Sequence, residues 1–157
     1  MIRQTPGDLL EIEFEGKFYY MVVLTKITMF GGNIVFAFHG DGSRLCEEHL
    51  TTDAPGFNAC TDLLWAKRKR TVNRIRRFDD ISKFWKTRFA KGTPGALPGH
   101  KPSAWYIYRI DDLQNHIERT SVLPPQFADA MDHVTYSFSK TASLILEGYT
   151  PDKTPLL

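Results

Sequence analysis

The chain has 157 residues, of which 42% are hydrophobic and 24% charged, so we expect residues 1–157 to form a single globular domain. No run approaches the about 20 apolar residues that cross a bilayer, and the first residues lack the basic-then-apolar order of a secretory signal. These patterns predict a cytoplasmic protein that has no membrane-spanning helix and does not bind a membrane. Two cysteines, Cys46 and Cys60, are too few for a disulfide scaffold.

Charge is distributed unevenly, although the formal net charge is only +2. Residues 67–91 hold eleven of the twenty lysines and arginines and only two aspartates, which gives this window a charge of +9. The residues before it sum to −5 and those after it to −2. A striped charge distribution says more about the partners of a protein than its total charge does.

The first third of the sequence predicts three strands. Residues 10–15 alternate apolar and acidic side chains, the period of a half-buried strand. Glu15-Gly16 supplies a tight reversal, and residues 17–24 are apolar on both faces, as in a strand that is covered on both sides. Residues 33–38 predict a third buried strand, which a turn with two glycines ends.

The middle of the chain predicts shorter elements. We expect a short strand or extended segment over 44–50 and a loop over 51–58. Residues 62–69 favour a helix and 72–78 an extended segment. Asp79-Asp80 can cap a short helix that includes residues 81–85. Three glycines and three prolines in 92–102 exclude regular structure there.

In the second half, the aromatic run 105–110 predicts a strand. The aspartates that follow it predict a helical turn over 111–117, and Pro125 begins a short helix through Met131. Two alternatives are open further on: strands over 134–138 and 143–148, or a helix over 140–147. Residues 150–157 are expected to be a flexible tail. The fold class is α+β, mostly β: a partly open barrel of the N-terminal strands with short helices.

No motif in the sequence predicts a catalytic residue, a metal site or a cofactor. Cys46-x-x-His49 has a ligand-like gap but no second pair to complete a zinc site. The glycines of residues 95–102 are one position too close for a phosphate-binding loop, and Pro102 replaces the hydroxyl that binds magnesium. There is no G-x-S-x-G elbow.

Two charged surfaces are therefore the candidate sites. Three outward carboxylates form a predicted acidic patch for a basic protein partner: Glu11, Glu13 and Glu15. The basic window, interleaved with aromatic residues, could bind a protein partner or grip a nucleic-acid backbone. Its candidate residues are Lys67, Arg68, Lys69, Arg70, Arg74, Arg76 and Arg77.

Gly7-Asp8 at the start of an alternating strand, followed by Gly16 and an aromatic strand, resembles the bacterial immunity protein family numbered twenty-six, found beside polymorphic toxins. The match in layout covers residues 6–38, and Phe84-Trp85 and Trp105 match its later Trp- and Phe-rich segments loosely. The resemblance implies a non-enzymatic protein that binds and blocks a cognate toxin or effector.

The same opening is similar to the PemK-like toxins, small SH3-like barrels that cleave RNA. Their second strand carries an Arg-Pro pair, and this sequence has Tyr19-Tyr20 there, a departure that argues against ribonuclease activity. The resemblance still implies an SH3-like barrel. Our leading hypothesis is a toxin-neutralising immunity protein or inhibitor, not an enzyme. The alternatives are a nucleic-acid-binding module that uses residues 67–91 and an RNA-cleaving barrel.

Overall fold

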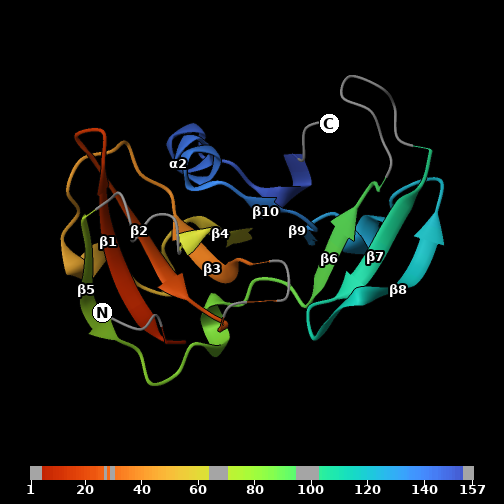
Figure 1. The fold of residues 1–157 in the computed structure, drawn as a ribbon, viewed down its shortest axis with the longest axis horizontal. Coiled ribbons are helices and arrows are strands. Elements are labelled where there is room, and N and C mark those ends of the chain that lie inside the picture. The colour runs from red at the N-terminus through yellow and green to blue at the C-terminus, as the bar shows by residue number, and fades with distance from the viewer. Residues whose placement is uncertain (1–4, 27, 29–30, 64–70, 95–102, 154–157) are drawn as a thin grey trace. The chain divides into compact units, whose positions relative to one another are not determined.

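The computed structural model describes residues 5–26, 28, 31–63, 71–94 and 103–153. The chain divides into two compact units, each built on its own sheet (Figure 1). Unit 1 comprises Met1–Trp85 and Thr135–Tyr149, and unit 2 comprises Lys86–Val134 and Thr150–Leu157. The expectation of a single domain over 1–157 stays a prediction.

Unit 1 is built on a six-stranded sheet in the order β10-β4-β3-β2-β1-β5. All neighbours are antiparallel except the pair of β10 and β4. The strands are β1 (Asp8–Phe14), β2 (Lys17–Val23), β3 (Asn33–Phe38), β4 (Gly56–Thr61), β5 (Thr71–Arg77) and β10 (Thr135–Tyr136). The three predicted N-terminal strands and the extended segment near 72–78 are thereby confirmed.

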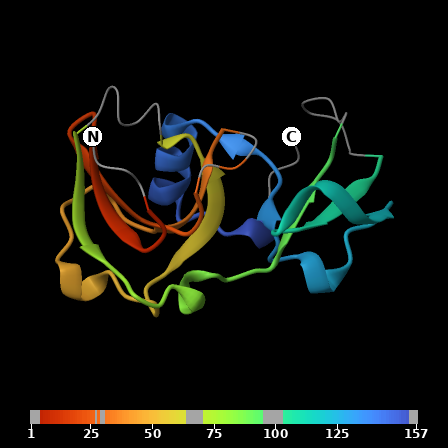
Figure 2. The ribbon, with the colours of Figure 1, turned by 60° about the horizontal axis from the view of Figure 1, so that its bottom comes forward.

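One face of this sheet is covered by the helix α2 (Phe138–Glu147), which lies inside the curve of the sheet (Figure 2). The hydroxyl of Ser137 accepts the Lys140 amide at its start, and Gly148 ends it in the left-handed conformation. Phe138 packs its ring against Phe14 and Tyr19, with centroids 5.5 and 5.9 Å away. These contacts form the main apolar core of unit 1.

On the other face of the sheet the 3₁₀ turn η2 (Ser82–Phe84) packs through its buried residue Phe84, while the turn η1 (Glu47–His49) has no buried residue. The ring of Phe84 lies 5.5 Å from Phe36 and 4.9 Å from Phe78. Of the two alternatives for 44–50, the strand is wrong. The amides of His49 and Leu50 donate to carbonyls three residues earlier, and none of the described strands pairs with this segment, which is extended at Cys46.

Unit 2 is built on a four-stranded sheet in the order β8-β7-β6-β9. Its strands are β6 (Phe89–Gly92), β7 (Trp105–Arg109), β8 (Asp112–Thr120) and β9 (Met131–Asp132), of which only β6 and β9 pair in parallel. Ile107 packs with Phe127 and Ala130, from the turn η3 (Pro125–Phe127) and the residues after it, to form a small core. The turn η4 (Pro151–Lys153) completes the described part of this unit.

Several expected boundaries in the second half are corrected. The helical turn over 111–117 is wrong, because a two-residue loop joins β7 to β8 and Asp112 accepts the amides of Gln114 and Asn115 inside that hairpin. The short helix from Pro125 ends at Phe127, and β9 follows. In the first half, the expected loop over 51–58 is too long, because β4 already begins at Gly56. The helix alternative near 140–147 is confirmed by α2, so the strand over 143–148 is wrong.

The observed class is α+β and mostly β, as expected, with two mixed sheets that both stay open among the described residues. Two expectations fall largely outside those residues: the helix over 62–69 and the irregular segment over 92–102. In the expected tail, residues 151–153 form η4, and 154–157 lie outside the described residues. None of the helices in the described ranges has the length and apolar character that crossing a membrane requires.

Candidate binding surface at the β1–β5 edge

The Gly7-Asp8 pair joins β1 to the strands on both sides of it. Gly7 has φ +99°, its amide donates to the Val23 carbonyl over 2.8 Å, and its carbonyl accepts the Phe78 amide over 2.8 Å. A Cβ at this position would stand 2.5 Å from the carbonyl oxygen of Phe78. Both the backbone conformation and the space therefore require glycine.

We expect Gly7→Ala to lower the free energy of unfolding by about 2 kcal/mol, because the side chain would adopt a strained φ and displace the Phe78 carbonyl. Gly16→Ala is the matched control, since Gly16 also has positive φ but nothing lies within 4 Å of its Cβ position. Urea denaturation of the two variants measures the difference. Equal losses would show that the contact with Phe78 has no energetic weight.

Asp8 is a fully buried carboxylate that fixes the start of β1 to the end of β5. Its Oδ1 accepts the Arg77 Nε over 2.8 Å and lies 3.9 Å from an Arg74 nitrogen, and its Oδ2 accepts the Thr5 amide over 2.9 Å. Charge-assisted bonds of this kind are short and directional. The guanidinium of Arg77 is thus held in one orientation at the sheet edge.

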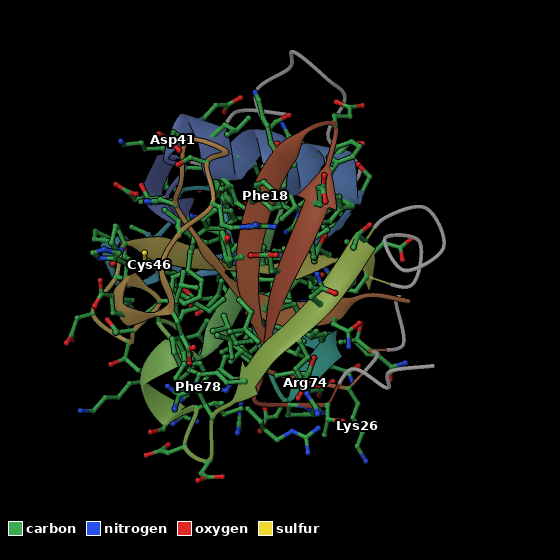
Figure 3. The ribbon with its side chains drawn as sticks, turned by 90° about the vertical axis from the view of Figure 1, so that its left-hand side faces the viewer. Phe18, Lys26, Asp41, Cys46, Arg74 and Phe78 are labelled. Atoms are coloured by element: carbon green, nitrogen blue, oxygen red, sulfur yellow. The ribbon has the colours of Figure 1, made fainter. Side chains whose placement is uncertain are left out.

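The strand β5 presents three arginines, and among the described strands it has a neighbour on one side only, β1. The side chains of Arg74, Arg76 and Arg77 are 45%, 50% and 47% exposed. Arg76 stacks over the Phe78 ring at 4.4 Å and lies 3.5 Å from Glu47. Figure 3 shows this side of unit 1, with Arg74 on β5 and Phe78 just beyond its end. We call Arg74, Arg76 and Arg77 the β5 arginines.

The structure thus brings the last three residues of the predicted basic stripe together on one strand. The other four, Lys67, Arg68, Lys69 and Arg70, lie outside the described residues. A bulge in the pairing of β1 with β5 places Arg74 opposite Leu10 and Arg76 opposite Leu9. Consecutive residues such as Leu9 and Leu10 point to opposite faces of a strand, and paired residues share a face. The β5 arginines are consequently distributed over both faces of the edge rather than along one of them.

The predicted acidic patch is not uniform. Glu13 and Glu15 are exposed, as expected. Glu11 is only 14% exposed; it accepts the hydroxyl of Tyr20 over 2.8 Å and lies 3.7 Å from Arg44 Nε. The expectation that Glu11 is solvated is wrong, because Tyr20 and Arg44 cover its side chain. Burial is the main cause that raises the pKa of Tyr20, and its bond to Glu11 adds to the effect.

The residues weighed for metal chemistry lie apart. Cys46 is exposed before η1, and the His49 imidazole faces Glu48 at 3.8 Å. Cys60 is buried on β4, where its sulfur lies 3.5 Å from the Thr135 hydroxyl, and burial raises the pKa of its thiol. Within the described ranges, no three or more His, Cys, Asp or Glu side chains are grouped as metal ligands.

Lys91 in β6 is a buried charge that sequence reasoning missed, and it is 2% exposed. Its ammonium donates to the carbonyls of Ala128 and Pro151 over 2.6 and 2.5 Å, and its register partner in β9 is the buried Asp132. Burial lowers the pKa of Lys91, opposed by the nearby carboxylates. The local sequence held no signal of this, because the acceptors lie 37 and 60 positions away.

Comparisons of this chain with protein-family models, with curated proteins and with solved structures found no match.

Proposed function

We propose that this chain is a non-enzymatic binding protein that takes an acidic, extended segment of a protein partner on the edge strand β5. The observation that carries the proposal is the edge position of a strand bearing three half-exposed arginines. An edge strand offers backbone amides and carbonyls to an added strand, and guanidinium groups pair with carboxylates in a fixed geometry.

The anchoring of β5 supports this use of the surface. The buried carboxylate of Asp8 holds Arg77, and the backbone of Gly7 pairs with Phe78, so the edge is ordered before a partner arrives. A preordered edge loses less conformational entropy on binding than a flexible one. The arginines also attract an acidic partner over a distance and so speed its association.

The partner class that we propose is a toxin or effector that the chain neutralises by contact, as the resemblance of the Gly7-Asp8 opening implies. The burial of the β2 tyrosines supports a non-enzymatic role. Tyr19 and Tyr20 stand where PemK-like enzymes carry an Arg-Pro pair, and they are 4% and 2% exposed, so neither ring is presented to an RNA. The SH3-like barrel is the finer architecture that we propose for the curved sheet of unit 1, and Glu13 and Glu15 form a second, smaller contact surface.

Binding to a synthetic ten-residue peptide in which pairs of Glu alternate with pairs of Val, labelled with fluorescein, tests the surface, because its carboxylates lie on both faces of an added strand. We expect Arg74→Gln/Arg76→Gln to weaken binding of this peptide about tenfold at low salt, because two charge-assisted contacts are lost. Arg77 is left in place, since it bonds to Asp8. The measurement is fluorescence anisotropy, with backbone NMR shifts expected along β5.

Lys140→Gln/Lys153→Gln removes the same charge from exposed positions elsewhere and is the matched control. An equal loss in the control would reduce the effect to net charge and contradict a contact at β5. The nucleic-acid alternative rests on the same arginines. A short duplex that competes with the peptide and binds this chain more tightly than the peptide does would favour that alternative. Growth rescue from a co-expressed toxin domain encoded beside this chain tests the proposed biological role.

A further inference from the structure

The sheet of unit 2 has two unlike faces. Ile107, in the middle of β7, points to the face that η3 covers. Tyr106 and Tyr108 alternate with it and so point to the other face. The strand pairing places Arg119 opposite Tyr106 and His116 opposite Tyr108, and the chain leaving β9 adds His133. We call these five side chains the ring face of unit 2.

The rings of this face contact one another in series. Tyr108 and His133 are stacked, with centroids 3.8 Å apart and planes within 6°. The ring of His116 stands edge-on to Tyr106 at 4.8 Å and to Tyr108 at 6.4 Å. Arg119 Nε donates to the Tyr106 hydroxyl over 3.1 Å. The His133 Nε2 lies 2.8 Å from the Leu113 carbonyl, which fixes the ring at one end of the series.

The polar side chains of the ring face are the ones that solvent reaches. His116 and Arg119 are exposed and Tyr106 is half-buried, whereas Tyr108 is buried between its neighbours. Beside them, Ile117 lies at a bulge of β8 and is 52% exposed, one of the few large apolar side chains that reach solvent in the described chain. The face therefore offers ring, aliphatic and guanidinium surface together.

Charge on the two faces of this sheet is segregated. Ile107 marks the face that η3 covers, and its partners in the neighbouring strands are Glu118 and Lys91. Asp132 lies opposite Lys91, so both carboxylates, Glu118 and Asp132, belong to the covered face. The strand positions of the ring face carry Arg119 and His116 and no carboxylate. Such a face suits an anionic ligand with flat apolar parts.

We propose that the ring face binds single-stranded nucleic acid, with bases stacked on His116 and Tyr106 and a phosphate held by Arg119. Sheet faces that carry exposed rings beside a cation bind unpaired bases in this way, and they tolerate sequence because every base has a flat face. A duplex would hide its bases and leave only the phosphate contact. This surface belongs to unit 2, so it is independent of the β5 arginines and of the proposed partner there.

The test uses the full chain and a fluorescein-labelled 12-residue oligouridylate, whose binding is followed by anisotropy at low salt. We expect His116→Ala/Arg119→Gln to weaken binding about tenfold or more, the effect of losing one stacked base and one phosphate contact. Both side chains are exposed, and thermal denaturation checks that the variant is folded. The control, Lys140→Gln on α2, is expected to bind as the wild type does. NMR shift changes of the Tyr106 ring protons on binding report the stacking on Tyr106.

Four outcomes would overturn the proposal. The first is absence of binding by the wild type at low salt, and the second is an equal loss in the control. The third is equal affinity for a duplex of the same length, which would mean that phosphates alone are contacted. The fourth is a loss of binding in Arg74→Gln/Arg76→Gln but not in His116→Ala/Arg119→Gln, which would assign the nucleic acid to the β5 edge. Peptide binding at β5 is measured separately, so its failure and the failure of this proposal are distinguishable.

Discussion

Replacement of Lys91 by methionine is expected to lower the free energy of unfolding by about 3–5 kcal/mol, because a buried ammonium loses two charge-assisted hydrogen bonds. Methionine fits the volume but donates no hydrogen bond to the carbonyls of Ala128 and Pro151 and carries no positive charge beside Asp132. The loss should be concentrated in unit 2. Hydrogen exchange is the measurement, with faster exchange expected for the amides of β6 and β7.

The same residue gives the stability of unit 2 a dependence on pH. Because burial lowers the pKa of Lys91 below its ordinary 10.5, the folded state releases this proton at a lower pH than the unfolded state does. Between the two pKa values the unfolded state binds more protons, so stability rises with pH. The wild type should gain stability relative to Lys91→Met as the pH approaches 10.5 from below.

Lys153→Met, at an exposed position of η4, is the control for both measurements, and it should change stability by less than about 0.5 kcal/mol. A loss below about 1 kcal/mol in Lys91→Met would mean that the ammonium is not the link between β6 and η4 that its two carbonyl contacts describe.

Replacement of Phe138 by alanine is expected to lower the free energy of unfolding of unit 1 by about 4 kcal/mol, as large-to-small changes of buried aromatic residues do. Phe138 has no exposed surface, and its ring packs edge-on against Phe14 and Tyr19, so it joins α2 to both strands of the N-terminal hairpin. Urea denaturation measures the loss, and exchange of the β1 and β2 amides locates it.

Leu146→Ala on the same helix is the matched control, because Leu146 is exposed and its loss opens no cavity in the core. We expect it to cost less than about 1 kcal/mol. If the two variants were equally stable, α2 would not be held against the sheet through Phe138, and the packing of unit 1 would need another account.

The elements that the sequence predicted correctly are those with a strong local pattern. The strands β1, β2 and β3 alternate or are apolar throughout, so neither signal depends on distant residues. The strand β8 was missed because both of its faces are largely exposed, which leaves no period of two, and because Asp112 suggests a helix cap while it caps a turn within a hairpin. The range 140–147 stayed open between strand and helix, because a short apolar run fits both until its partner face is known.

The candidate surface was predictable in composition and not in arrangement. The basic stripe was visible, and Arg74, Arg76 and Arg77 do lie on one strand. What the sequence could not show is that Asp8, 69 positions before Arg77, is buried against it, or that Tyr20 and Arg44 cover Glu11. The contacts of Asp8 with Arg77 and of Glu11 with Arg44 join distant parts of the chain, whereas Tyr20 lies opposite Glu11 in the local β1–β2 hairpin. The ring face of unit 2 was missed for the same reason, since its histidines come from β8 and from the residue after β9.

The path of the chain through its two units has a consequence for biosynthesis. The strands β1 to β5 leave the ribosome first, but α2 and β10, which complete their sheet, follow only after the whole of residues 86–134 has been made. During that interval the concave apolar surface that α2 later occupies is open to water and to other nascent chains. Unit 2 can meanwhile pair its strands β6 to β9, but Lys91 gains its acceptor at Pro151 only after α2 has been made. Both units are therefore completed by the last residues to be translated.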